Sequence, residues 1–189
     1  FWFDLPLGLL LAFIFHNIVR NSLLDNLPFF LRARFSAFRL FDWNEYFNKN
    51  WAAVIISLII GAASHLLWDG FTHKYGCFVA IMPALTNQIN FWNAQVPVFN
   101  ILQHASTIVG GLAVVFAVYK LPIDRKETGS VSIKYWVIAA GITLGIVGIR
   151  FLSGLEIRQY GNVIVTVISA GLISLILTPW IVKTKVTGD

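Results

Sequence analysis

The chain has 189 residues, of which 57% are apolar and 12% are charged, whereas about a quarter of a soluble domain is charged. Together with a mean hydropathy of +0.73, this deficit excludes an ordinary soluble domain. The net charge is +5, but the basic residues lie in short segments between apolar runs, so we expect no nucleic-acid partner. The single cysteine, Cys77, excludes an intrachain disulfide and a Cys-rich zinc site. A metal would therefore need His and carboxylate ligands.

Five apolar runs are each long enough to cross a bilayer, which takes roughly 20 helical residues. They predict an all-α, polytopic integral membrane helix bundle that forms a single membrane domain over residues 1–189. The chain starts inside its first apolar run without a Met, so we expect a further segment upstream. The predicted spans cover about residues 5–24, 51–69, 101–119, 133–152 and 163–182.

The basic residues divide unequally between the two sides of these spans. Eleven Lys and Arg fall on one side and three on the other, so the positive-inside rule orients the loop after the second span outward. A helix over about residues 29–40 carries Arg32, Arg34 and Arg39 among Phe, Leu and Ala, which is typical of a helix in the membrane interface.

Ionisable groups inside an apolar span are costly, so the polar end of the second span is a candidate site. On a continuous helix His65, Asp69, Thr72 and His73 share one arc of roughly 100°. His65 and His73 would be about 12 Å apart along the axis, too far for one metal ion. A break of the helix at Gly70 would bring His73 closer.

The third span starts with a second polar group around His104. Because a loop that leaves one span and enters the next begins and ends on the same face, Asp69, His73 and His104 share one side of the membrane. Their nitrogen and oxygen atoms suit a divalent ion such as zinc. We expect metal ligation by His65, Asp69, His73 and His104, catalysis by Asp69 and His104, and contacts to ligands or substrate from Ser64, Thr72, Gln103 and Thr107.

Simpler interpretations stay open for these residues. His65 and Asp69 would also make a hydrogen-bonded pair that fixes helix packing. Ser64 is adjacent to His65 and points elsewhere on the helix, which disfavours a Ser-His-Asp triad.

Three basic residues elsewhere in the spans are candidate substrate contacts. His16 and Arg20, four residues apart in the first span, could bind a phosphate or carboxylate, although core hydrogen bonding and snorkelling are the favoured explanation. Arg150, at the end of the fourth span, would suit an anionic head group or anchor its helix in the interface.

At these residues the chain resembles an uncharacterised family of multispanning bacterial membrane proteins, classed as a domain of unknown function. Its S-H-x-x-x-D-x-x-T portion is also similar to the YdjM-type membrane-bound metal-dependent hydrolases, which implies that His65 and Asp69 are metal ligands. The closer family has further His and Asp motifs ahead of Phe1. The resemblance covers residues 3 to about 111 and rests on Phe3 to Gly8, His16-Asn17, Asp25 to Pro28, Ser64-His65 through Asp69 to His73, Gln103-His104 and Ser106-Thr107.

Together these observations predict a metal-dependent hydrolase of the bacterial inner membrane. Its site would face the extracytoplasmic side and act on a lipid or amphiphilic phosphate or ester, with the Phe91-Trp92 loop as a lid. The alternative is a non-catalytic structural subunit that binds membrane lipids and partner membrane subunits. A transporter is disfavoured because the sequence shows no paired halves.

Overall fold

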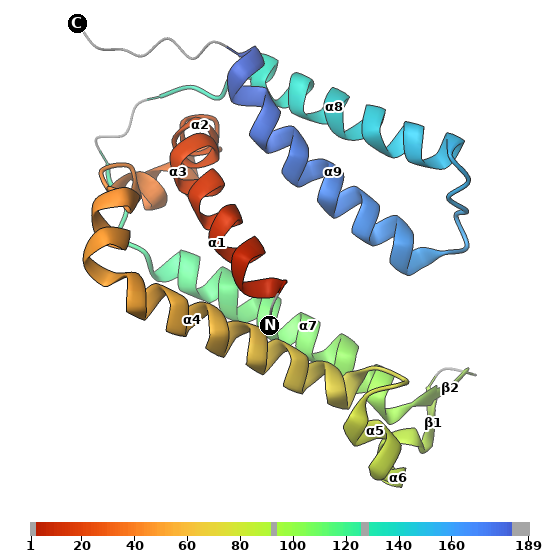
Figure 1. The fold of residues 1–189 in the computed structure, drawn as a ribbon. Helices are drawn as coiled ribbons and strands as arrows, with labels where there is room; N and C mark the ends of the chain where they lie inside the picture. The colour runs from red at the N-terminus through yellow and green to blue at the C-terminus, as the bar shows by residue number, and fades with distance from the viewer. Residues whose placement is uncertain (1–2, 92–93, 126–128, 183–189) are drawn as a thin grey trace, which may run out of the picture. The chain divides into compact units, whose positions relative to one another are not determined.

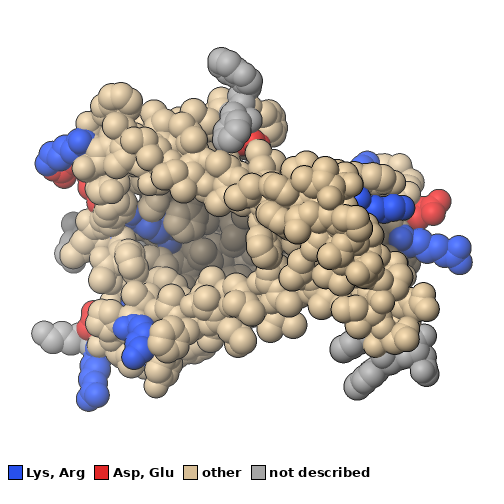
Figure 2. Space-filling model, turned by 90° about the horizontal axis from the view of Figure 1, so that it is seen from below, with Lys and Arg blue, Asp and Glu red and all other residues tan. Residues whose placement is uncertain are grey.

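The computed structural model describes residues 3–91, 94–125 and 129–182. Within them five helical segments are long and apolar enough to cross a membrane, which confirms the predicted all-α, polytopic fold. Lys, Arg, Asp and Glu cover only small parts of the face in Figure 2, as expected for a chain surrounded by lipid. The segments are Asp4–Asp25, Trp43–Ile81, Val98–Lys120, Ile133–Leu152 and Tyr160–Ile181.

The chain separates into two compact units. The first unit combines Phe1–Leu9 with Asn44–Leu121, and the second combines Leu10–Trp43 with Pro122–Asp189. Helix α1, Asp4–Ile14, therefore begins in the first unit and ends in the second.

The main helices of the first unit are α4, Trp43–Thr72, and α7, Val98–Lys120, which run side by side in Figure 1. Helix α4 begins eight residues before the predicted span, with non-helical angles at Asn50 (φ −129°, ψ 25°). Its polar first turns contain an ion pair between Lys49 and Glu45, 2.6 Å apart. Apolar character marks only the part of a helix that crosses lipid, so the sequence could not predict this polar extension.

The segment between α4 and α7, expected as a loop, has structure of its own. It contains the short helices α5, Cys77–Ile81, and α6, Pro83–Thr86, followed by strands β1, Gln88–Phe91, and β2, Ala94–Pro97. The strands pair antiparallel, with Gln88 opposite Pro97 and Phe91 opposite Ala94. This compact connection returns the chain to the start of α7 on the side where α4 ends.

The second unit is built on α8, Ile133–Leu152, and α9, Tyr160–Ile181, which pack side by side (Figure 1). Small or hydroxylated residues, which let helix backbones approach closely, are buried here. The unit also contains a π-helix, Phe15–Val19, followed by α2, Arg20–Asp25, and α3, Phe29–Phe35. The buried residues of α9 are Ala170, Ser174 and Thr178.

The predicted interfacial helix over about 29–40 is shorter in the structure. Helix α3 ends at Phe35 and continues as a 3-10 turn, Ser36–Phe38. Arg32 is buried, and a side chain at Gly129 would lie 3.1 Å from its guanidinium carbon. The Asp124 N–H donates to the Ala33 carbonyl at 2.8 Å. Asp124 and Gly129 therefore lie against α3, at Ala33 and at the buried Arg32.

Candidate functional site

The polar residues at the end of α4 lie on a helix that does not break at Gly70. Helix α4 continues to Thr72, and the His73 N–H still donates to the Asp69 carbonyl at 3.0 Å. Gly70 instead allows a close approach, because a Cβ there would lie 2.9 Å from the Phe78 ring. A Cβ on Gly76 would overlap the Gly70 carbonyl oxygen. The two glycines let the chain fold back onto the end of α4.

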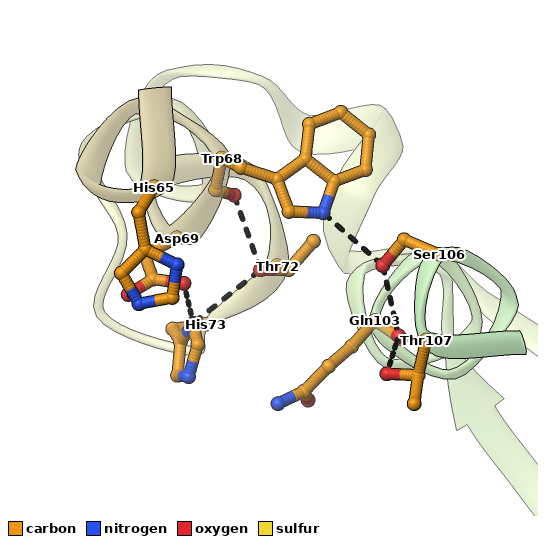
Figure 3. Close-up of polar contacts among 8 residues, drawn as sticks. All are labelled: His65, Trp68, Asp69, Thr72, His73, Gln103, Ser106 and Thr107. Atoms are coloured by element: carbon orange, nitrogen blue, oxygen red, sulfur yellow. Dashed lines mark hydrogen bonds and ion pairs between the residues drawn. The ribbon is translucent and has the colours of Figure 1, made fainter. Parts of the chain in front are cut away.

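Asp69 lies between two histidines on the exposed side of α4 (Figure 3). Its Oδ2 is 3.5 Å from His65 Nε2, and its Oδ1 is 3.5 Å from His73 Nδ1. The side chain of Asp69 is 35% exposed, whereas those of His65 and His73 are 76% and 54% exposed. The two rings thus meet the same carboxylate through different oxygens.

Thr72 contacts His73, one of these two histidines. It is buried, and its hydroxyl donates to the Trp68 carbonyl at 3.1 Å. The same oxygen lies 3.4 Å from His73 Nδ1. Because the Thr72 proton is directed to Trp68, its oxygen is placed to accept from an Nδ1–H, which leaves His73 Nε2 with a lone pair.

Trp68 joins α4 to α7. Its indole Nε1 donates to Ser106 Oγ at 3.1 Å, and Ser106 and Thr107 each donate to the Gln103 carbonyl at 2.9 Å. The Gln103 side chain points from α7 toward α4 in Figure 3. Sequence reasoning assigned Trp68 no role. The sequence did contain one indication of this contact, because a buried indole N–H within a membrane span usually needs a hydrogen-bond acceptor.

Two of the expected site residues, His104 and Ser64, make no polar contact with Asp69 among the described residues. His104 is exposed and precedes Ser106 by two residues, so it projects about 160° around α7 from the residue that contacts α4. The Ser64 hydroxyl donates to the Gly61 carbonyl of its own helix at 2.9 Å. The structure therefore brings together His65, Asp69, Thr72 and His73, with Trp68 linking this helix to Ser106.

The described residues contain no group of three His, Cys, Asp or Glu side chains arranged to hold a metal ion. The pairwise geometry nevertheless suits zinc in part. Two tetrahedral ligands at about 2.1 Å from zinc are about 3.4 Å apart, close to the 3.5 Å that separates Asp69 from each histidine. Asp69 with one histidine thus fits two positions of a zinc site, and the complete set is not present in the described part of the chain.

The other candidate residues lie in the second unit. Arg20 is buried and contacts His16, with Nη1 3.3 Å from Nδ1. Arg150 is exposed on α8 and lines a groove of about 410 Å³ with residues of α9, among them Thr166. Of the predicted lid, Trp92 and the side chain of Phe91 lie outside the described residues.

No curated protein and no solved structure matches this chain. A family model does match, over residues 1–180. This match covers nearly all the described helices, including both spans that carry the Asp69 cluster. The chain belongs to the family described as domain of unknown function DUF4184.

Proposed function

We propose that this chain carries part of the active site of a membrane-embedded, metal-dependent hydrolase that acts on a lipid or another amphiphilic phosphate or ester. The observation behind the proposal is the Asp69 carboxylate, each of whose oxygens lies 3.5 Å from a different histidine within a membrane-spanning segment. Ionisable groups at such positions are costly and commonly serve function. The similarity of the S-H-x-x-x-D-x-x-T portion to YdjM-type hydrolases supports the same assignment.

In this proposal His65 and Asp69 hold a divalent ion, for which zinc suits the nitrogen and oxygen donors. Such an ion would lower the pKa of a bound water molecule to about 7 and polarise the substrate oxygen. Thr72 orients His73 so that its Nε2 can accept a proton. The remaining ligands would come from the His and Asp motifs that the resemblance puts ahead of Phe1.

The position of the cluster supports this substrate class. It lies at the end of α4 and near the start of α7, where lipid headgroups would meet water. The Gln103 side chain, which points toward α4, supplies an amide that can donate to a phosphate or ester oxygen. The count of basic residues supports an extracytoplasmic site in the bacterial inner membrane.

The test is elemental analysis of the detergent-purified, full-length protein beside a His65→Ala/Asp69→Ala variant. Glu45→Ala is the control, because it removes a carboxylate that lies 20 residues before His65 on the same helix and pairs with Lys49. We expect about one zinc or manganese per chain, lost in the double variant and kept in the control. Absence of stoichiometric metal from the unmodified protein would contradict the proposal.

One observation favours the alternative, a non-catalytic subunit whose polar groups fix helix packing. The hydrogen bond from Trp68 to Ser106 joins α4 to α7. Under this alternative the His65→Ala/Asp69→Ala variant would lower the melting temperature without changing the metal content. The two readouts together therefore separate the two functions.

A further inference from the structure

Arg20 is a buried cation in the first membrane-spanning segment. It is 7% exposed, and among the described residues no carboxylate contacts it. Its partners are neutral: Nε donates to Asn21 Oδ1 at 3.1 Å, and the guanidinium carbon lies 5.8 Å from the centre of the Phe41 ring. Asp25, the nearest acidic residue in the same segment, pairs with Arg39 at 2.9 Å. A buried charge without a counter-ion is costly, so an anion bound to Arg20 would stabilise the protein.

His16 extends this set of donors. Arginine can only donate a hydrogen bond, so in the 3.3 Å contact with Arg20 the His16 Nδ1 accepts and the ring proton is on Nε2. The ring is held by a parallel stack on Trp43, with centroids 4.4 Å apart and planes 6° apart. His16 is half-buried and therefore presents its Nε2–H from a fixed orientation.

The backbone at this point is also unusual. Phe15–Val19 forms a π-helix, and the Arg20 N–H donates to the carbonyl of Phe15, five residues earlier. Such wide turns are rare and are found frequently at functional sites. The π-helix contains His16 and ends directly before Arg20, so both donor residues lie at the irregular turn.

We infer that His16 and Arg20 form a binding site for the phosphate group of a membrane phospholipid. A guanidinium presents paired N–H donors that match phosphate oxygens. Arg20 lies about 7.5 Å along the helix axis from the end of the span at Asp25, a depth that a lipid headgroup can reach. Leu11 and Phe15 expose apolar side chains on the same span, where acyl chains would lie. The site is within the second unit and does not depend on the proposed hydrolase.

The test measures how phosphatidylglycerol binds to the purified full-length protein, by native mass spectrometry across a lipid titration. Arg20→Gln removes the guanidinium, and Arg34→Gln is the matched control, since it removes an arginine from α3 whose Nη1 donates to the Phe30 carbonyl. We expect saturable binding that weakens about tenfold or more in Arg20→Gln and stays unchanged in Arg34→Gln. Equal binding by all three proteins, or no saturable binding by the unmodified protein, would overturn the inference.

Two further arms complete the experiment. If Arg20→Gln does not fold, as judged by circular dichroism, His16→Gln replaces it: weaker lipid binding would support the site, and unchanged binding would overturn it. Excess inorganic phosphate distinguishes the source of the anion. Failure of inorganic phosphate to displace the lipid is the expected result, whereas displacement would assign the site to free phosphate.

Discussion

In each of the two units a membrane-spanning helix has a histidine four residues before another ionisable group, but the two pairs suit ligands of opposite charge. In the first unit His65 and Asp69 lie on a regular turn of α4, and both are at least one-third exposed. In the second unit His16 and Arg20 are joined across a π-helix, and Arg20 is buried. The first pair presents lone pairs that suit a cation, and the second presents N–H donors that suit an anion. The same spacing therefore does not specify a ligand, because the charge of the partner and the shape of the turn decide it.

The largest loss of stability should come from Gly76→Ala, which should destabilise the first unit and leave the second unchanged. The new Cβ would overlap the backbone of Gly70, which cannot move without shifting the end of α4. We expect a loss of about 3 kcal/mol of unfolding free energy and of bound zinc, with phosphatidylglycerol binding retained. Thermal unfolding and elemental analysis measure this. Gly61→Ala is the control, because its Cβ meets nothing within 4 Å. A Gly76→Ala protein as stable as Gly61→Ala would contradict the close approach.

Ala170→Leu should perturb the second unit in the same selective way. Ala170 has no exposed surface in α9, so a larger side chain must separate α9 from its neighbours, at a cost of about 1–3 kcal/mol. Thermal unfolding in detergent measures the loss, and zinc content should not change. The control is Val137→Leu on the exposed face of α8. If both substitutions destabilise equally, the packing of α8 against α9 is not as described.

Trp68→Phe tests the link between α4 and α7 with a smaller effect. The substitution keeps an aromatic side chain but replaces the indole by a smaller ring without the N–H that donates to Ser106. We expect a loss of about 1 kcal/mol in unfolding free energy, and the same from Ser106→Ala. A double-mutant cycle of thermal or denaturant unfolding should show that the two losses do not add. Additive losses would mean that the two side chains do not interact.

Ser64→Ala should have the smallest effect on stability and on zinc content. It compares Ser64 with its neighbours His65 and Asp69 on α4. Within the described part of the chain, the Ser64 hydroxyl bonds only to the Gly61 carbonyl of its own helix. We expect a change within about 0.5 kcal/mol in unfolding free energy, and zinc content equal to that of the unmodified protein. A marked loss of zinc in Ser64→Ala would return this residue to the site.

The co-facial arrangement of the cluster could be predicted from the sequence, because helix periodicity alone puts His65, Asp69 and Thr72 on one arc. Its connection to α7 could not. A break of the helix at Gly70 was one possibility in the sequence, but Gly70 instead allows the close approach of Phe78 and Gly76, which occurs only when the chain folds back. His104 was grouped with Asp69 because both lie on one side of the membrane, but membrane side does not determine which way a helix faces.

The sequence by itself determined the all-α, five-span architecture, because an apolar segment of about 20 residues must satisfy its backbone hydrogen bonds within its own helix. It also determined that a histidine and an acid would share a face of α4. Only the tertiary structure decided which polar groups find partners. Trp68 meets Ser106 across 38 positions of the chain, and Arg20 is buried with no acid in contact among the residues that the structure describes. Such contacts join residues far apart in the sequence, and no local periodicity encodes them.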